Sequence, residues 1–443
     1  IFSIFAMSSA IISFYLNINL SVITSNSGIN EYLSELDIFT KNGGAVNDLR
    51  THWEYIQILK NDINNLFLYE LGVDYKLLNY PLHHLIISQI PFVNSNLKIY
   101  LLIFFIISLF LPVLFYKCLV IKYENISREK LLVLASIIYI LPGFQYSAIW
   151  GNSHVTALFF LLFSIYFFLK LEKSNFEKSK HIYYSIFFLA LAAYVKQFYV
   201  FLFPFYLLII IKEKALPIYK AIIFISVLGL PGLIFLIKNP VLLFGLRLND
   251  INITNFPSSI LISSSIIFIY LIPFIFQYFI NNRTTYKTLF LEVLKKKNTI
   301  LIVTLIFLIL NNYFYYDSNI GGGLVYKLSK IILKNNYIFL LVAYLGFYSI
   351  IYYSGKNIYS YFLSILLLMT FSTGFFIFQK YFEPMFFIII FLLINKELIK
   401  KVFNFNTHVI FFYFACYWVT YFVYSANLIK KMHILLPQIG LIY

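Results

Sequence analysis

The sequence contains few charged residues: they make up 12% of its 443 residues, against about 25% in an ordinary soluble domain. Apolar residues make up 61%, and the mean hydropathy is +0.83. Stretches of roughly 17 to 25 mostly apolar residues recur along the chain, and each is long enough to cross a hydrocarbon core about 30 Å thick. The scarcity of charge therefore excludes a water-soluble globular protein and predicts a chain that lies in a lipid bilayer.

Segments of alternating polarity, which a membrane β-barrel needs, are missing as well, and residues 101–113 are apolar throughout. Helices satisfy their backbone hydrogen bonds within one segment, as the water-free bilayer interior demands. We therefore predict an all-α transmembrane bundle of about 11 to 13 spans. It forms a single integral membrane domain over residues 1–443.

Cysteine is scarce too, because Cys118 and Cys416 are the only two and lie in separate apolar segments. This excludes a disulfide framework. The sequence also lacks an obvious internal repeat, a second soluble domain and a glycine-rich phosphate loop of the GxxxxGK type. The first apolar stretch, residues 2–23, is interpreted as a first span or a truncated signal anchor, since the sequence starts at Ile1 without a methionine.

The formal net charge is +16, but the basic residues do not form the single cluster that would indicate nucleic acid as a partner. They occupy every second short connection between the apolar stretches, namely 117–130, 170–180, 212–220, 283–297, Lys356 and 396–401. By the positive-inside rule these connections face the cytoplasm. The expected surroundings are membrane lipids in a multi-pass protein, of the endoplasmic reticulum if the chain is eukaryotic and of the plasma (inner) membrane if it is bacterial.

The opposite connections are then non-cytoplasmic, and the first of them, residues 25–97, is much the largest. It holds eight of the 18 acidic residues and three of the seven histidines, and long loops usually carry a function. Within it, residues 54–59 and 66–71 fit short helices along the membrane surface. The remaining spans follow in residues 98–425, with 324–334 predicted to be a helix lying in the interface.

The densest polar group in this loop is Asn-Asp-Leu-Arg-Thr-His-Trp-Glu at residues 47–54. On a helix, Asp48 and His52 are four residues apart, so they share a face and one can orient the other. A positioned carboxylate can act as a general base on a sugar hydroxyl, and a nearby histidine can bind a phosphate. The alternative is that Asp48 caps a helix that begins near Leu49.

Further along, Tyr80 and Pro81 lead into the next span region, followed by His83 and His84. Pro81 suits the first turn of a helix. Adjacent histidines on a helix point about 100° apart and do not easily face one ion. We therefore predict that the pair lines a polar cavity rather than binding a metal.

Two polar pairs interrupt later apolar runs. Lys196 and Gln197 lie within the run 186–211, where an ionisable group should face a cavity or a partner. Lys196 is interpreted as a cation that holds a phosphate, or alternatively as a lysine that snorkels to the interface. Lys380 and Glu383 lie between two other apolar runs, in a segment that is equally consistent with a simple turn.

The segment Trp150 to His154 adds a polar cluster on the same side of the membrane. Asn152 is predicted to cap the span that follows. His154 is a candidate contact for a sugar or a phosphate.

The order of these features resembles the GT-C superfamily of polyprenyl-phosphate-sugar glycosyltransferases. The shared pattern is a first span, a large external loop with an early acidic motif, a Tyr-Pro start to the next helix, and a Lys/Arg-Gln hairpin. Locally, the spacing of Asp48 and His52 and the run His52-Trp53-Glu54 are similar to the dolichyl-phosphate-glucose-dependent α-glucosyltransferases that extend the lipid-linked oligosaccharide. The sequence breaks their proline pair, with Tyr80 in place of the first proline of one branch and Leu82 in place of the second proline of the other. It also has Lys196 where the glucosyl branch has Arg.

The resemblance implies transfer of a hexose, with inversion, from a polyprenyl-phosphate sugar donor to a lipid-linked glycan or protein acceptor at the non-cytoplasmic face. In such enzymes a carboxylate deprotonates the acceptor and cations stabilise the departing lipid phosphate. The resemblance implies no soluble cofactor, and it leaves open whether such an enzyme uses a divalent cation. The candidate residues are Asp48 and His52 for catalysis, Lys196, Gln197 and Lys380 for the donor phosphate, and Arg50, Trp53, Glu54, Tyr80, His83, His84, His154 and Glu383 for substrate contacts.

Two alternatives belong to other classes. A transporter or flippase for lipid-linked saccharides would also be polytopic and basic, but it would more often show paired inverted repeats or broken helices in its two halves, and the sequence indicates neither. A polymerase of the O-antigen type would carry its large external loop late in the chain, whereas this chain carries it first.

Overall fold

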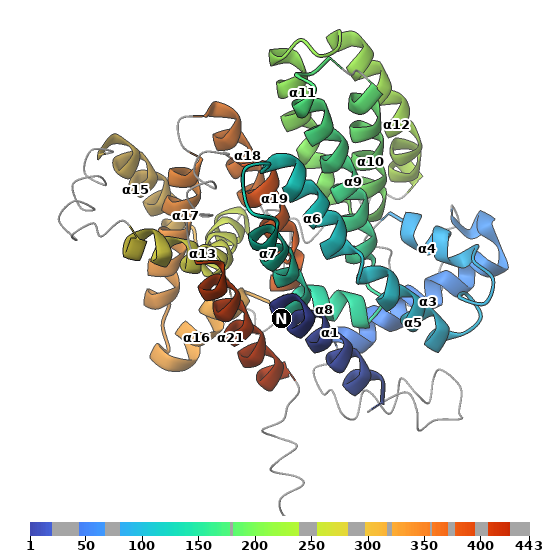
Figure 1. Cartoon of the computed structure of the whole chain (residues 1–443), viewed down its shortest axis with the longest axis horizontal. Helices are drawn as coiled ribbons and strands as arrows, with labels where there is room; N and C mark the ends of the chain where they lie inside the picture. The colour runs from blue at the N-terminus through green and yellow to red at the C-terminus, as the bar shows by residue number, and fades with distance from the viewer. Residues whose placement is uncertain are drawn as a thin grey trace, which may run out of the picture.

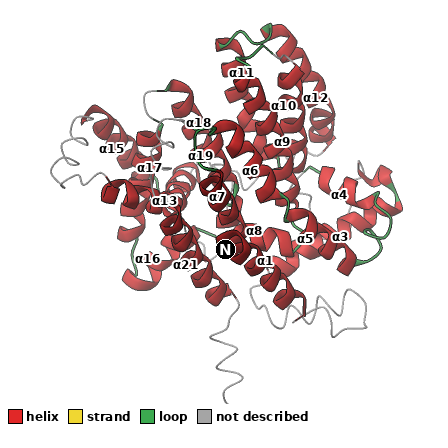
Figure 2. Cartoon of the chain, viewed as in Figure 1, coloured by secondary structure: helices red, strands yellow, loops and turns green. Residues whose placement is uncertain are grey.

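The protein is described by a computed structural model that covers residues 1–19, 44–66, 80–177, 180–238, 255–281, 297–316, 321–354, 357–370, 377–394 and 406–425. Over these residues the regular secondary structure is helical, and none of them forms a strand (Figure 2). The prediction of an all-α fold is confirmed for this part of the chain.

Four helical segments in the described ranges are long and apolar enough to cross a membrane. They are Leu97–Lys122, which joins α5 (Leu97–Ser108) to α6 (Leu111–Lys122), α9 (Ser153–Lys173), most of α12 (Ile218–Lys238) and most of α13 (Asn255–Asn281). A fifth is formed if α7 (Arg128–Ile140) and α8 (Pro142–Ile149), which are bent by 60° at a break, count as one span. Several apolar helices of 10–17 residues accompany them. A multi-pass helical bundle is therefore supported, and the number of about 11 to 13 spans stays a prediction.

The remaining helices complete the bundle around these segments (Figure 1). Their bounds are α1 (Phe2–Asn19), α3 (Gly44–Asn61), α4 (Leu82–Ser88), α10 (Lys180–Val195), α11 (Leu202–Lys212), α15 (Lys297–Asn312), α16 (Gly323–Leu333), α17 (Tyr337–Tyr353), α18 (Ile358–Met369), α19 (Met385–Leu392) and α21 (Thr407–Ser425), with short 3-10 turns η1 (Ile63–Leu66), η2 (Gln197–Phe201) and η5 (Gln379–Tyr381). Of the predicted surface helices, 54–59 is part of α3 and 324–334 corresponds to α16. Of the predicted helix 66–71, only Leu66, the last residue of η1, lies within the described residues.

The interior of the bundle holds buried serines and other polar residues among large apolar side chains, and many large apolar side chains are also exposed on the outside. Ser263 to Ser265 on α13 are fully buried, whereas Ile223 on α12 and Leu301 on α15 are more than half exposed. Gly346 brings α17 against α13, because a Cβ at this position would lie 1.9 Å from the carbonyl oxygen of Ser264. Small residues at helix contacts and apolar side chains on the outside are typical of bundles whose solvent is lipid.

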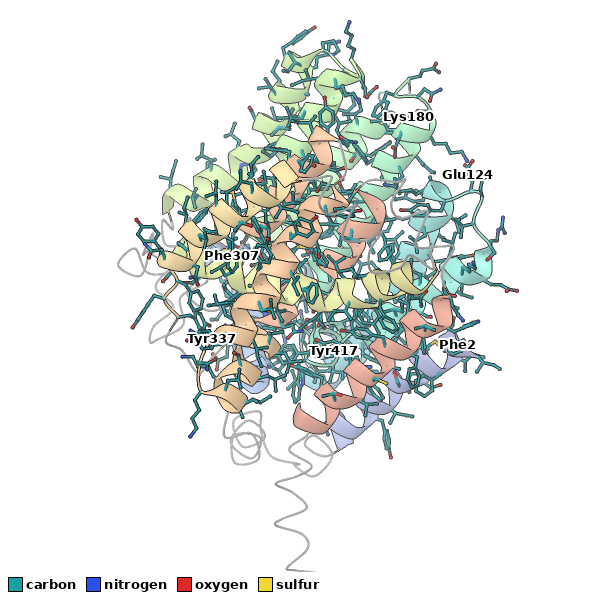
Figure 3. The ribbon with its side chains drawn as sticks, turned by 90° about the vertical axis from the view of Figure 1, so that its left-hand side faces the viewer. Phe2, Glu124, Lys180, Phe307, Tyr337 and Tyr417 are labelled. Atoms are coloured by element: carbon teal, nitrogen blue, oxygen red, sulfur yellow. The ribbon has the colours of Figure 1, made fainter. Side chains whose placement is uncertain are left out.

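The antiparallel helices α9 and α10 define two ends of the molecule. The 21-residue helix α9 is about 30 Å long, and α10 packs against it and runs back. Lys173 and Lys180 therefore lie at one end, and Asn152 and Lys196 at the other. Figure 3 shows Lys180 in the upper part of the molecule and Tyr417 of α21 in the lower half.

Candidate functional site

Asp48 lies inside α3, which begins at Gly44. The alternative that it caps a helix beginning near Leu49 is therefore wrong, because the helix has already started. Leu49, Trp53 and Ile56 are buried and hold one face of α3 against the bundle. Their spacing is that of a helix face, so the adjoining face presents Asp48 and His52 to the helices packed beside it.

One oxygen of the Asp48 carboxylate accepts three hydrogen bonds. Its Oδ2 accepts from the Tyr146 hydroxyl at 2.9 Å, from the Asn152 amide nitrogen at 3.2 Å and from the Lys380 ammonium. No described residue donates to Oδ1. The Asp48 side chain is 34% exposed and Lys380 is 17% exposed, so the pair is reachable from solvent. The site thus holds a carboxylate with one oxygen fixed and the other available.

Lys380 is held among aromatic rings as well as by Asp48. Its ammonium lies 4.5 Å from the ring centroid of Tyr146, 5.2 Å from that of Phe378 and 5.9 Å from that of Tyr381. Contacts of this kind between a cation and an aromatic face are attractive and keep the charge in place without neutralising it. Lys380 can therefore share its charge between Asp48 and an incoming anion.

Glu383 does not fit the predicted substrate contact, since it is 3% exposed and both of its oxygens are engaged. One oxygen accepts from the Tyr417 hydroxyl at 2.6 Å and from the Tyr270 hydroxyl, and the other from the backbone N–H of Gly143. Burial raises the pKa of the Glu383 carboxyl, and these hydrogen bonds oppose the rise. Glu383 instead holds the turn that carries Lys380.

Gly143 explains how closely this turn approaches α8. A Cβ on Gly143 would lie 2.7 Å from the Cβ of Glu383 and 2.9 Å from the Cα of Lys380. Only glycine leaves room for the turn at this position. Because α8 also carries Tyr146, the Glu383 hydrogen bonds place two of the three groups that hold Asp48.

Asn152 has two functions in the structure. Its Oδ1 accepts the backbone N–H of His154 at 3.1 Å, which confirms the predicted cap of α9, while its amide nitrogen donates to Asp48. His154 is buried, with its ring centroid 5.2 Å from that of Tyr381 and 6.1 Å from that of Phe198. The segment after Trp150 thus joins the site through Asn152, with His154 packed beside it.

His52, His83 and His84 form a buried cluster on α3 and α4. Nδ1 of His52 and Nε2 of His84 are 2.7 Å apart, and the ring centroids of His83 and His84 are 5.1 Å apart. His83 also bonds the Thr156 hydroxyl at 2.9 Å. Burial, reinforced by the charge of Lys196, lowers the pKa of His83 to about 3. Within the described ranges, no group of three or more His, Cys, Asp or Glu side chains is arranged to hold a metal ion.

Lys196 lies between α10 and η2 and is 5% exposed. It does not snorkel to the surface, so that alternative is wrong. Its ammonium makes no hydrogen bond or ion pair with any described residue. Burial lowers its pKa to about 7, with Asp48 raising it and Lys380 lowering it further. Lys196 is therefore a buried cation next to the Asp48 site that makes no direct ion pair with a described side chain.

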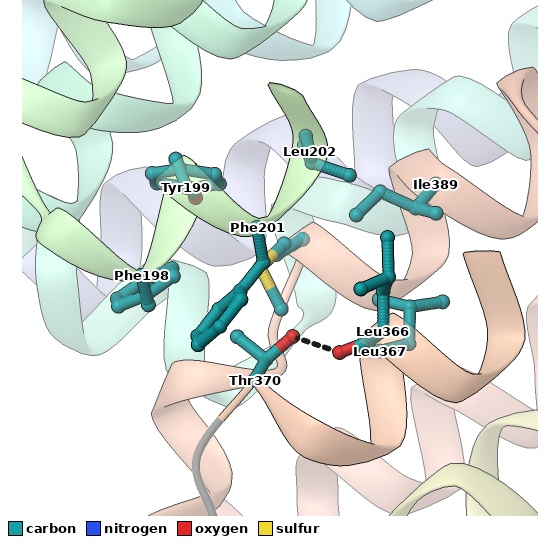
Figure 4. A pocket seen from close by; sticks show the side chains of 9 residues that line it. Phe198, Tyr199, Phe201, Leu202, Leu366, Leu367, Thr370 and Ile389 are labelled. Atoms are coloured by element: carbon teal, nitrogen blue, oxygen red, sulfur yellow. Dashed lines mark hydrogen bonds between the residues drawn. The ribbon is translucent and has the colours of Figure 1, made fainter. Parts of the chain in front are cut away.

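A small apolar pocket adjoins the segment after Lys196 (Figure 4). Phe198 and Leu202 line it from η2 and α11, Leu366 from α18, and Met385 and Ile389 from α19. The hydroxyl of Thr370, which also lines it, donates at 2.8 Å to the carbonyl oxygen of Leu366, so it does not present a free donor to the pocket. The pocket offers apolar side chains close to two segments that carry lysines.

The other predicted site residues lie elsewhere or outside the description. The Tyr80 hydroxyl donates at 3.2 Å to the carbonyl oxygen of Gly232, which belongs to α12. Trp53 packs on Tyr100, with ring centroids 5.7 Å apart. Glu54 is exposed, and the side chain of Arg50 lies outside the described residues. Gln197 begins η2 directly after Lys196.

Sequence reasoning missed Tyr146, although it bonds Asp48 directly. The chain contains 38 tyrosines, and no spacing distinguishes this one. The available signal was its position, because the segment from Trp150 to His154 was expected at the same membrane face as Asp48 and Tyr146 lies four residues before it.

No family model, curated protein or solved structure matches this chain. Its function is therefore argued from the geometry of the site.

Proposed function

We propose that the protein is an inverting membrane glycosyltransferase that moves a hexose from a polyprenyl-phosphate donor to a lipid-linked glycan or protein acceptor. The supporting observation is the Asp48 carboxylate, with Oδ2 held by three donors, Oδ1 without a described donor, and two lysines beside it. This combination provides a base for a hydroxyl and a positive field for a phosphate. The motifs at 47–54 and 196–197, which resemble those of GT-C enzymes, support the same chemistry.

In the proposed reaction the acceptor hydroxyl oxygen attacks the anomeric carbon of the donor sugar while its proton passes to Oδ1 of Asp48. The bond between that carbon and the phosphate oxygen breaks, and the phosphate leaves with the electron pair as polyprenyl phosphate. A single displacement of this kind inverts the anomeric centre. Tyr146 and Asn152 keep the carboxylate oriented, which is the usual advantage of a pre-positioned base.

The departing phosphate gains negative charge, and Lys196 and Lys380 supply the compensating positive charge. A fixed cation in a water-poor site stabilises developing charge more strongly than the same cation in water. Lys196 makes no direct ion pair with a described side chain, so an anion can pair with it without breaking an existing ion pair. Lys380 is held by Asp48 and three rings, from which it can turn toward the phosphate.

The site lies at the end of α9 and α10 opposite Lys173 and Lys180. By the positive-inside rule the basic end is expected to face the cytoplasm, which supports a reaction at the non-cytoplasmic face. A lipid-linked donor suits that face because its apolar chain stays in the bilayer. A substrate of this class would be delivered through the membrane rather than from water.

One observation favours a second candidate, a transporter or flippase for lipid-linked saccharides. The break between α7 and α8 bends the chain by 60° next to Gly143 and Tyr146. Transporters commonly build their sites at such discontinuous helices, and the sequence did not indicate this break. A transporter would move the lipid-linked sugar without forming a new glycosidic bond.

The test is a transfer assay with purified protein in nanodiscs, a synthetic polyprenyl-phosphate hexose and membrane acceptor lipids, with products identified by mass spectrometry. We expect glycosylated acceptor with the wild type and a loss of at least about 100-fold with Asp48→Asn, because the amide cannot accept the proton. Asp62→Asn is the matched control, since Asp62 is exposed and accepts only from the backbone of Asn64 in the described structure. Full transfer by Asp48→Asn, or translocation of the donor without transfer, contradicts the proposal.

A further inference from the structure

Tyr417 of α21 ties the turn that carries Lys380 to the bundle. Its buried hydroxyl donates at 2.6 Å to Oε1 of Glu383 and accepts from the side-chain amide of Gln379. Gln379 comes directly before Lys380 and Glu383 three residues after it, so both ends of the turn are bound to one hydroxyl. The Tyr270 hydroxyl of α13 donates to the same oxygen of Glu383, so the turn keeps an attachment when Tyr417 is replaced.

The next residue of α21, Trp418, holds α8. Its indole N–H donates at 2.8 Å to Oε1 of Gln145, whose amide nitrogen donates at 2.8 Å to the carbonyl oxygen of Tyr139. An indole only donates and a carbonyl only accepts, so these two bonds fix the orientation of the Gln145 amide. Tyr139 lies on α7, so Gln145 bridges the break between α7 and α8, and Trp418 holds this bridge. The residue after Gln145 is Tyr146, which donates to Asp48.

These two contacts act on the spacing between two of the three groups that hold Asp48. The ammonium of Lys380, on the turn, and the hydroxyl of Tyr146, on α8, both donate to Oδ2 of Asp48. The ammonium also lies 4.5 Å from the ring centroid of Tyr146. Because one oxygen accepts from both groups, their spacing sets how the carboxylate is turned and where Oδ1 points.

We infer that Tyr417 and Trp418 are positioning residues: from adjacent places on α21 they fix Lys380 and Tyr146 relative to each other, and so orient Asp48. This role rests on the proposed glycosyl transfer. Both residues act through others, Tyr417 through the turn and Trp418 through Gln145. It gives the last described helix, α21, a function in the site.

Three substitutions on α21 test the inference. We expect Tyr417→Phe and Trp418→Phe each to lower kcat about tenfold, because a misplaced base is costly. Tyr413→Phe is the matched control, since the Tyr413 hydroxyl donates at 2.9 Å to the carbonyl oxygen of Ile269 on α13, and it should keep kcat within about twofold. An equal loss in all three variants would show that α21 only needs to be docked, and it overturns the inference.

Double variants distinguish positioning from a general loss of structure. If Tyr417 acts through Lys380, adding Tyr417→Phe to Lys380→Gln should lower kcat by less than about twofold further. Adding Trp418→Phe to Tyr146→Phe should likewise have less than about a twofold effect. Losses that multiply in both backgrounds overturn the inference, because independent structural defects add in free energy.

A further measurement needs neither donor nor acceptor. Reductive methylation of lysines, followed by mass spectrometry, compares the reaction rate of Lys380 with that of the exposed Lys98 in the same sample. We expect Tyr417→Phe and Trp418→Phe to raise the relative rate at Lys380 by at least about threefold, since a loosened turn or α8 opens more often, and Tyr413→Phe to leave it unchanged. An unchanged rate in the first two variants overturns the inference. If the rate rises but the wild type transfers no sugar, the positioning is supported and only the proposed function fails.

Discussion

Single residues show where the sequence was informative about the site and where it was not. Lys196 and Lys380 were predicted because they interrupt apolar runs, where an ionisable group needs a cavity or a partner. Asp48 was predicted from the dense polar group at residues 47–54 of the first loop. The same signal misassigned Glu383, since a carboxyl that anchors a turn and one that binds a sugar interrupt an apolar run in the same way. Tyr146 was missed because its contact with Asp48 joins residues 98 apart in the sequence, which no local pattern records.

The buried ammonium of Lys196 has a testable pH dependence. Its pKa is lowered to about 7, mainly by burial, so it is charged below this pH and neutral above it. If the charged form binds the donor phosphate, kcat/KM for the donor falls as the pH rises above about 7, by up to about tenfold per pH unit. Initial rates at low donor concentration, measured between about pH 6 and pH 9, report this change.

Arginine at this position is the control for that prediction. A guanidinium stays protonated throughout this range, so Lys196→Arg should remove the fall on the alkaline side even if its overall rate is lower. A wild-type kcat/KM that does not change across the range, or an equal fall in Lys196→Arg, would show that the titration of Lys196 does not control donor use.

Among the helices, α12 shows how packing completes an element that the sequence leaves irregular. Pro231 interrupts its hydrogen-bond ladder, and the Tyr194 hydroxyl is inserted beside the break. This hydroxyl accepts the Gly232 N–H at 3.0 Å and donates to the carbonyl oxygen of Leu228. A side chain that enters the ladder in this way satisfies backbone groups that lipid cannot. The helix and its proline were visible in the sequence, but the tyrosine that bridges the break was not.

Removal of this hydroxyl should destabilise the protein. Tyr194→Phe leaves the Gly232 N–H and the Leu228 carbonyl without their bridging partner, and we expect the free energy of unfolding to fall by about 1 to 3 kcal/mol. Denaturant unfolding in a fixed detergent measures the loss, and hydrogen exchange should be faster at the Gly232 amide. Tyr219→Phe, at an exposed tyrosine of the same helix, is the control. Equal stability and exchange in the two variants would show that the bridge contributes nothing.

At the scale of the whole molecule, the sequence predicted the alternating direction of the helices better than the number of spans. Alternating basic connections predicted that consecutive helices reverse direction, and α9 and α10 do so. The span count is harder, because a hydropathy pattern does not distinguish a broken span such as α7 and α8 from two short helices of a hairpin. A break within a helical span depends on contacts such as the one between Gly143 and Glu383, which lie far apart in the sequence.

Orientation in the membrane is the remaining prediction, and thiol accessibility tests it. Cys118 and Cys416 are first replaced by alanine, and single cysteines are then introduced at Asp62, an exposed residue that follows α3, or at Lys173, an exposed residue at the basic end of α9. In intact cells or sealed right-side-out vesicles, we expect a membrane-impermeant maleimide to label Asp62→Cys and to leave Lys173→Cys unlabelled until the membrane is opened. Both positions must react after permeabilisation, which excludes burial as the reason for protection. The reverse labelling pattern would place Asp48 and Lys196 on the cytoplasmic side, where a water-soluble activated sugar could reach them. The requirement for a lipid-linked donor would then lose its physical basis.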